Sequence, residues 1–301
     1  MKRVLPFIAV SVLLASPASA QMDLSGEWVA HTDEDQPHRV PGAELGDYTG
    51  LPINAAARQK ADSWDASILS QPEQQAKPHP AQYFMRGPRP DVRWTKIVDP
   101  VSGRLIAYTM VGTFGRADRT IWMDGRPHPS AFAEHTYAGF STGEWVDNAL
   151  KVTTTHMKTA FIQRNGVPSS YRAVMTEFFV RHGNNLLMLS VVDDPIYLEE
   201  PLVRTQNWVL AENQHVGPAI PFEIVDELAD RPRGWVPHWP IGTRHTEFAE
   251  RFGLPFEATR GGKESLYPEY MKKIEQLKRD VSAIAGAKAE QPPSPPTEPT
   301  R

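Results

Sequence analysis

The sequence predicts a mainly β protein, built as an antiparallel barrel or sandwich. Short runs rich in β-branched and aromatic residues recur at a spacing of roughly ten residues between positions 93 and 210. Turn signals such as Asp124-Gly125 and Asn165-Gly166 separate these runs. Helical periodicity is almost absent from this part of the chain. Because closing a sheet removes its exposed edges, a barrel is favoured over a sandwich.

Individual strands follow from β-rich runs bounded by turns. The expected strands cover residues 93–98, 105–111, 119–123, 141–145, 150–155, 173–181, 186–192 and 203–210. An earlier strand is expected to open at Gly26, Glu27 and Trp28. A Gly-x-Trp opening is common in lipocalin-like barrels, where the tryptophan plugs the closed end. A core tryptophan on any edge strand remains the alternative.

Two segments outside these strands have a different composition. Residues 36–91 are rich in proline and predict a loop or strap, with one short helix at 54–62 that Asn54 caps. Such a strap often covers a barrel mouth, although a surface wrap without a role in chemistry is the alternative. The barrel domain is therefore expected to span 21–212. Residues 213–288 predict loops and helices, at 245–252 and 268–284, packed on the barrel, and 289–301 predict a disordered Pro-rich tail.

The N-terminus predicts a cleaved signal peptide at 1–20. Lys2 and Arg3 precede an apolar run of about a dozen residues, which is too short to span a bilayer. The motif at 18–20, Ala-Ser-Ala, is a cleavage signal that predicts a mature chain beginning at Gln21. The chain has no cysteine for a lipid anchor, so we expect export to a bacterial periplasm without membrane insertion.

Composition narrows the classes of function. The 301 residues are 40% hydrophobic and carry a formal net charge of -4, without a basic block, so no nucleic-acid partner is expected. The G-x-S-x-G match at 139–143 (GFSTG) sits in a β context without the helix that a nucleophile elbow needs, and the sequence lacks a G-x-G-x-x-G motif after a strand, a P-loop and a cysteine nucleophile. Nucleotide-cofactor and α/β-hydrolase chemistry are therefore disfavoured, and no cofactor is expected.

Period-two geometry in the run 150–158 predicts a titratable wall. Leu150, Val152, Thr154, His156 and Lys158 share one face of a strand. If the first three point inward, His156 and Lys158 lie along the same inner wall near the barrel mouth. Burial and a neighbour can then tune the pKa of the imidazole. The alternative is a hydrogen-bonded core histidine.

The strand at 173–181 has one candidate acid. Either Glu177 or Phe178 must face inward, because adjacent side chains point to opposite faces. An inward Glu177 near His156 would form an acid–base pair. In the alternative, Glu177 is solvated and Phe178 forms part of an apolar wall around the ligand.

Loop residues add further candidates. His128, His135 and His79 are expected to gather with His156 at the barrel mouth. Their spacing matches no metal motif, so no metal site is predicted. Arg126, with Arg116 and Arg119 as further candidates, could clamp an anionic or phenolate group, structural salt bridges being the alternative. Trp122, Tyr137 and His79 complete the predicted substrate-binding set.

Three motifs together carry a family resemblance. The segments 121–129 (IWMDGRPHP), 139–145 (GFSTGEW) and 193–197 (DDPIY) resemble a large family of exported bacterial proteins with the pattern DGRxHP…GxSxGxW…DPxxY. The resemblance covers about 54–210 and implies a lipocalin-like (calycin-type) β-barrel with extra loops and helices. Most members have no assigned reaction. The run 155–158 (THMK) departs from the family's usual Gly-Phe-Asn-Asp, which suggests a subfamily with its own chemistry.

These observations favour an enzyme that acts by general acid–base catalysis on a small hydrophobic or aromatic molecule in the barrel cavity. His156 would be the base or acid, assisted by Lys158, Glu177, His128 and His135. A cofactor-independent lyase, hydratase or isomerase needs only proton transfer and positioning, and fragment loss from a lignin-type aromatic dimer would be one example. A non-catalytic carrier of an apolar ligand and an envelope interaction module are the alternatives. A homodimer is compatible with the sequence.

Overall fold

The computed structural model describes residues 22–31, 44–65, 67–68, 71, 74–75, 77–84, 91–112, 118–162, 165–213, 216, 230, 232 and 235–284. The predicted signal peptide and Pro-rich tail, and Arg116, lie outside these residues. The strands are β1 (Gly26–His31), β2 (Val92–Val98), β3 (Leu105–Gly112), β4 (Arg119–Trp122), β5 (Phe140–Val146), β6 (Ala149–Thr155), β7 (Ala160–Phe161), β8 (Pro168–Ser169), β9 (Val174–His182), β10 (Asn185–Asp193) and β11 (Leu202–Leu210). The helices are α1 (Ala55–Asp62), α2 (Ala81–Phe84), α3 (Glu247–Phe252), α4 (Phe256–Thr259), the 3₁₀ helix η2 (Lys263–Leu266) and α5 (Pro268–Ile284).

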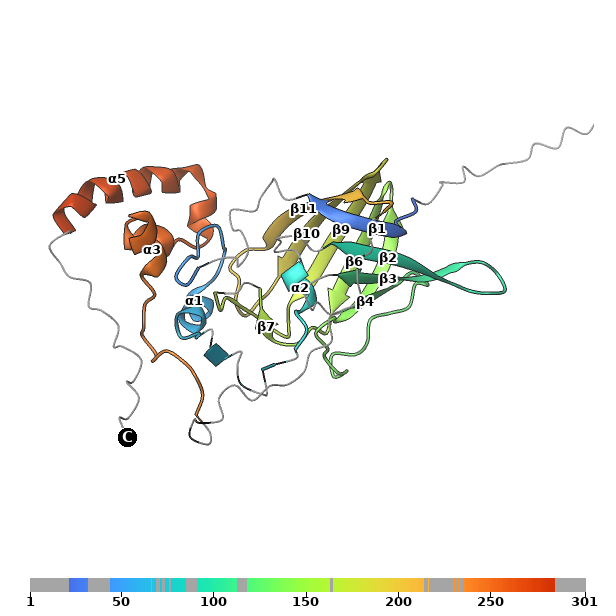
Figure 1. Cartoon of the computed structure of the whole chain (residues 1–301), viewed down its shortest axis with the longest axis horizontal. Helices are drawn as coiled ribbons and strands as arrows, with labels where there is room; N and C mark the ends of the chain where they lie inside the picture. The colour runs from blue at the N-terminus through green and yellow to red at the C-terminus, as the bar shows by residue number, and fades with distance from the viewer. Residues whose placement is uncertain are drawn as a thin grey trace, which may run out of the picture.

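The prediction of a mainly β, lipocalin-like barrel is confirmed (Figure 1). The strands close in the order β1-β11-β10-β9-β6-β5-β4-β3-β2. Neighbouring strands of the barrel are antiparallel except β4 and β5, which run parallel with Ile121 opposite Ser141. A parallel pair needs a crossover connection, and residues 123–139 supply it. The expectation of a purely antiparallel barrel is therefore wrong at this one junction.

Alternating side chains fill the barrel interior, as the period-two pattern predicts. On β9, Met175, Glu177 and Phe179 are buried, whereas Phe178 between them is only half-buried on the outer face. Three fully buried tryptophans, Trp28, Trp94 and Trp208, occupy the interior. The Trp28 indole donates to the Leu24 carbonyl oxygen at 3.0 Å, so this buried donor is satisfied.

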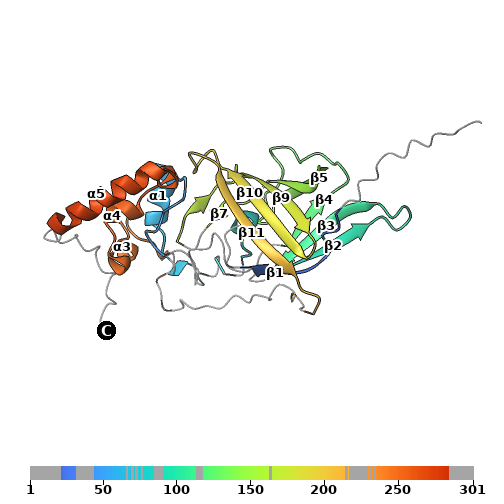
Figure 2. The ribbon, with the colours of Figure 1, turned by 90° about the horizontal axis from the view of Figure 1, so that it is seen from above.

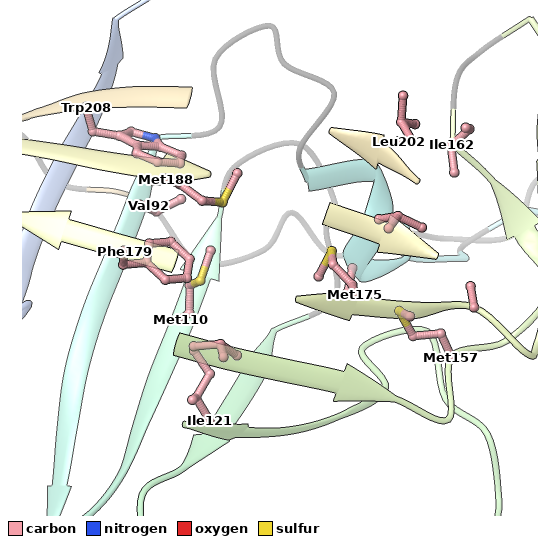
Figure 3. Close-up of a cluster of buried hydrophobic side chains, with 14 of the residues drawn as sticks. Val92, Met110, Ile121, Met157, Ile162, Met175, Phe179, Met188, Leu202 and Trp208 are labelled. Carbon is pink, nitrogen blue, oxygen red and sulfur yellow. The ribbon is translucent and has the colours of Figure 1, made fainter. Parts of the chain in front are cut away.

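The interior is layered along the barrel axis. One cross-strand row contains Gln206, Met188, Phe179 and Leu150; the next contains Arg204, Ser190, Glu177 and Val152; and the third contains Leu202, Val192, Met175 and Thr154. Figure 3 shows Met188 and Phe179 grouped with Met110 and Trp208, apart from the second group around Met175 and Leu202. The middle row therefore places the buried Glu177 carboxylate between two mainly apolar layers.

The C-terminal helices gather with α1 at one end of the molecule, whereas the β2–β3 hairpin lies at the other (Figure 2). Helix α1 begins after Asn54, whose side chain accepts from the Ala57 amide at 3.0 Å, so the predicted cap is confirmed. Ile53 forms a β-bridge with Leu198 after β10, which joins the segment before α1 to the barrel.

The helix predicted at 268–284 is confirmed as α5. The helix predicted at 245–252 is present but shorter, as α3. Within the described residues no helix is long and apolar enough to cross a membrane.

Candidate functional site

The histidine expected on the inner wall lies elsewhere, because the strand ends before it. Strand β6 ends at Thr155, and His156 has a left-handed backbone with φ of 56°. The alternation therefore breaks, and Met157 rather than His156 turns into the core, where it is fully buried. Lys158 is exposed. The prediction that His156 and Lys158 line the inner wall is wrong.

The crossover loop holds this irregular segment against the outside of the barrel. The Thr136 amide donates to the His156 carbonyl at 2.9 Å, and the Lys158 amide donates to the Thr136 carbonyl at 2.9 Å. Gly139, with φ of 72°, lies so close that a Cβ there would be 2.7 Å from the Thr155 carbonyl oxygen. Only glycine allows this approach, which places loop histidines beside β6.

Two histidines share one threonine hydroxyl. His128 Nδ1 lies 2.7 Å from Thr155 Oγ1, and His156 Nδ1 lies 2.7 Å from the same oxygen. His128 Nε2 lies 2.8 Å from Thr142 Oγ1, and His156 Nε2 lies 2.8 Å from the Ser130 carbonyl oxygen. We call Thr142, His128, Thr155, His156 and Ser130 the histidine–threonine chain.

A carbonyl at one end sets the direction of every hydrogen bond in this chain. Ser130 O can only accept, so His156 donates to it from Nε2, and in a neutral imidazole Nδ1 is then the acceptor. Thr155 therefore donates to His156 and accepts from His128 Nδ1. His128 Nε2 must then accept from the Thr142 hydroxyl. With both imidazoles neutral, this arrangement gives them opposite tautomers.

The partial burial of the His128 ring favours its neutral form. Partial burial, and secondarily the nearby His156, lower the pKa of His128 below its ordinary value. An uncharged imidazole is the form that can accept the proton of Thr142. The lowered pKa of His128 therefore agrees with the neutral form that these hydrogen-bond directions require.

His135 differs from the other two histidines because one ring nitrogen has no described partner. Its Nδ1 lies 3.1 Å from the Met157 carbonyl oxygen and must donate to it. In the neutral imidazole Nε2 therefore holds a lone pair, and no hydrogen bond to Nε2 is found within the described part of the chain. The ring centroid lies 5.1 Å from that of His156 and 5.8 Å from that of Tyr171. This geometry leaves His135 Nε2 available to accept a proton from a bound molecule.

The other loop candidates are already engaged with neighbours. The Lys158 ammonium lies 5.5 Å from the centroid of the Tyr137 ring. Burial raises the pKa of Tyr137, so its hydroxyl stays protonated at neutral pH. Arg126 stacks on Trp122 at 3.5 Å and pairs with Asp124 at 2.5 Å. The salt-bridge alternative therefore describes Arg126 in this structure.

His79 lies on the strap rather than in the histidine–threonine chain. Its ring stacks on that of Tyr83 on α2, with 3.8 Å between the centroids. The backbone nevertheless connects this strap to the loop of the site, because the Ala81 amide donates to the Tyr137 carbonyl at 3.1 Å. The structure thus brings together His128, His135 and His156, and places His79 on the adjoining segment.

Glu177 faces inward, but its partner is Arg119. The two terminal nitrogens of Arg119 donate to the two oxygens of Glu177 at 2.9 and 2.5 Å, and Nη2 also donates to Thr154 Oγ1 at 3.0 Å. Phe178 points outward opposite Lys151, so of the two alternatives the inward Glu177 is confirmed and an inner wall formed by Phe178 is wrong. For Arg119 the salt-bridge alternative holds. Arg119 is a charged residue on the inward face of β4, and a buried charge requires a counter-charge. This requirement is the sequence signal that could have predicted its pairing with Glu177.

A polar network inside the barrel and the histidine–threonine chain outside it lie on opposite faces of the same two strands, β5 and β6. Ser141 and Thr154 hydrogen-bond inside the barrel at 2.8 Å, whereas the next residues, Thr142 and Thr155, bind His128 outside. Adjacent residues of a strand point to opposite faces, which produces this division. The predicted site residues therefore belong to two sites, and the threonines that connect the histidines were not predicted.

Across the described ranges, no three His, Asp or Glu side chains converge as a metal site would require.

Comparison with protein-family models, curated proteins and solved structures finds no match to this chain. The resemblance to a family of exported proteins stays a prediction.

Proposed function

We propose that the protein is an exported, periplasmic enzyme that transfers a proton on a small hydrophobic or aromatic molecule, with His135 as the general base. The observation that carries the proposal is the free Nε2 lone pair of His135 beside a hydrogen-bonded histidine pair. General bases need a lone pair that a substrate can reach, and both ring nitrogens of His156 are occupied. The roles of the two histidines are therefore exchanged relative to the sequence-based expectation.

The neighbouring groups support this role. Met157 O would stabilise the imidazolium that forms when His135 takes a proton, because His135 Nδ1 already donates to this carbonyl. The histidine–threonine chain holds the His156 ring beside His135 in one tautomer. After the reaction His135 returns its proton to the product, so a lyase or isomerase would need no cofactor.

The substrate would bind on the outer barrel wall rather than in the barrel. Tyr171 is 53% exposed and contacts the His135 ring edge-to-face, and Phe132 on the crossover loop is 99% exposed. The exposed Tyr171 ring next to the base offers a surface on which an aromatic compound can stack. This location replaces the barrel cavity of the initial expectation.

A mass-spectrometric turnover screen tests the proposal. Purified protein would be incubated with pooled hydrophobic and aromatic metabolites, beside His135→Gln and the control His182→Gln, which changes an exposed histidine on β9. We expect His135→Gln to reduce turnover of a converted compound about 10²–10⁴-fold, and His182→Gln to leave it unchanged. Equal turnover by wild type and His135→Gln would contradict the role of His135. A compound retained but not converted by all three proteins would favour the carrier.

A further inference from the structure

The outer wall next to His135 carries a cation that no carboxylate neutralises. Lys158 is exposed, and its ammonium lies 5.5 Å from the centroid of the Tyr137 ring. Within the described part of the chain, Lys158 forms no ion pair. Contact with an aromatic face holds a cation near the ring without cancelling its charge. The Lys158 ammonium is therefore available to an anionic ligand.

The arginines that the sequence suggested for binding an anion already have carboxylate partners. Arg126 pairs with Asp124 at 2.5 Å on the surface, and Arg119 pairs with Glu177 at 2.5 Å inside the barrel. A guanidinium that is bound to a carboxylate through two N–H groups has fewer donors left for a ligand. Compared with these two arginines, Lys158 keeps an uncompensated charge.

A short backbone bridge holds Lys158 beside the proposed base. Thr136 pairs with Met157 in a parallel bridge, and Lys158 follows Met157 directly. His135, which donates to the Met157 carbonyl, precedes Thr136, and Tyr137, which contacts the ammonium, follows it. Residues two apart in an extended segment are separated by roughly 6–7 Å. One small aromatic molecule can therefore reach the imidazole with one end and the ammonium with the other.

The segments that meet at His135 have an excess of positive charge. Arg172, next to Tyr171, is exposed and forms no ion pair within the described ranges. Glu134 is the acidic residue next to His135, and it too is exposed and unpaired there. Two cations, Lys158 and Arg172, therefore outweigh one carboxylate. Such a local excess favours the approach of a negatively charged molecule.

We propose that the substrate is an aromatic carboxylate, whose carboxylate binds Lys158 while its ring stacks on Tyr171 beside His135. A carboxylic acid is ionised at neutral pH, whereas a phenol, with an ordinary pKa of about 10, is not. The proposal rests on the proton-transfer function and narrows its substrate from aromatic molecules in general to aromatic acids. Lys158 is then a substrate-binding residue rather than the catalytic residue that the sequence suggested.

Binding of three probes with one ring system tests the substrate class. The probes are 2-naphthoate, 2-naphthamide and 2-naphthylmethylammonium, which are negative, neutral and positive, and their Kd values are measured by NMR titration of backbone amides. We expect naphthoate to bind about three- to fivefold more tightly than the amide, and the ammonium to bind most weakly. Raising NaCl from about 0.05 to about 0.5 M should remove this order. Equal binding of the three probes, no binding, or shifts remote from His135, Lys158 and Tyr171 would overturn the proposal.

Two lysine variants locate the anion. Lys158→Gln removes the proposed contact, and the matched control Lys272→Gln removes the same charge from an exposed lysine on α5. We expect Lys158→Gln to weaken naphthoate binding about three- to fivefold and to leave naphthamide binding unchanged, and Lys272→Gln to change neither. Equal effects of the two variants on naphthoate would show that only the overall charge of the protein matters, and would overturn the role of Lys158.

Binding and turnover distinguish this proposal from the function on which it rests. His135→Gln retains Lys158 and should bind naphthoate as wild type does, and loss of binding in this variant would show that Lys158 does not hold the probe. Lys158-dependent binding without any His135-dependent turnover would contradict the proton-transfer function and leave only an anion-binding surface. His135-dependent turnover of neutral compounds, with the same Kd for all three probes, would overturn the aromatic-acid class and leave the function in place.

Discussion

The backbone of His156 decides on which face of the barrel the titratable groups lie. A φ of 56° is uncommon for a residue other than glycine. Here both ring nitrogens and the carbonyl of His156 are hydrogen-bonded, which offsets the strain. The turn sends Met157 into the core and keeps the imidazole outside. One residue thus separates the histidine cluster from the barrel interior.

The lowered pKa of His128 predicts that the stability of the folded protein depends on pH. Burial lowers its pKa in the folded state below the unfolded value of about 6.5, so the unfolded chain binds more protons below that pH. The stabilisation from neutral His128 is therefore present above about pH 6.5 and is lost as the pH falls through the folded-state pKa. We expect the difference in unfolding free energy between wild type and His128→Asn to shrink between about pH 7.5 and about pH 5.

Urea unfolding followed by circular dichroism at several pH values measures this difference. His182→Asn serves as the control, because its side chain is exposed and its replacement should leave the slope unchanged. A difference that grows as the pH falls would show that His128 is charged in the folded protein, contrary to its place as an acceptor from Thr142.

At the scale of elements, the Arg119–Glu177 pair connects strands that are not neighbours. Strands β5 and β6 lie between β4 and β9 in the barrel order. The side chains are 2% and 1% exposed, so the pair bridges the interior rather than the surface. Hydrogen bonds between adjacent strands cannot provide this connection. The pair therefore specifies which strands face one another across the barrel.

Removing one charge of this pair should be costly. Glu177→Gln leaves the Arg119 guanidinium buried without a counter-charge, and we expect a loss of about 3–5 kcal/mol in the free energy of unfolding. The double variant Arg119→Met/Glu177→Leu removes both charges and should recover most of this loss. Urea denaturation measures both values.

The exposed pair Lys151–Glu144 provides the control for these variants. Its side chains are 34% and 64% exposed, so Glu144→Gln should change stability by less than about 1 kcal/mol. If Glu177→Gln cost no more than Glu144→Gln, water would have to solvate Arg119, and the interior would be wetter than the burial indicates.

At the scale of the whole molecule, one ion pair joins the C-terminal helices to α1. Arg260 donates to both oxygens of Asp62, at 2.6 and 2.5 Å, and the Tyr48 hydroxyl donates to Asp62 Oδ1 at 2.8 Å. Burial, and then the Asp62 charge, raise the pKa of Tyr48, so the hydroxyl remains a donor. The C-terminal helices also contact the connection between β10 and β11, where Lys263 pairs with Glu199 and the Tyr267 hydroxyl donates to Glu200.

Asp62→Asn should release the C-terminal helices while leaving the barrel folded. We expect faster proteolytic cleavage between residues 235 and 277 and unchanged protection of β9 and β10, measured by limited proteolysis and hydrogen exchange. Lys263→Ala is the matched control, because Lys263 and Glu199 are 43% and 42% exposed. Loss of protection throughout the barrel in Asp62→Asn would show instead that α1 is required for barrel stability.

Local sequence patterns determined the elements of this protein. Period-two alternation and turn dipeptides located the main barrel strands, and Asn54 marked the start of α1, because each pattern acts over a few residues. Only the tertiary structure decided that β4 and β5 are parallel, that Glu177 meets Arg119, and that His128 and His156 meet through Thr155 outside the barrel. These outcomes depend on barrel closure and on one left-handed residue, and neither has a periodic signal. Alternation says which side chains share a face, whereas long-range packing decides which groups they meet there.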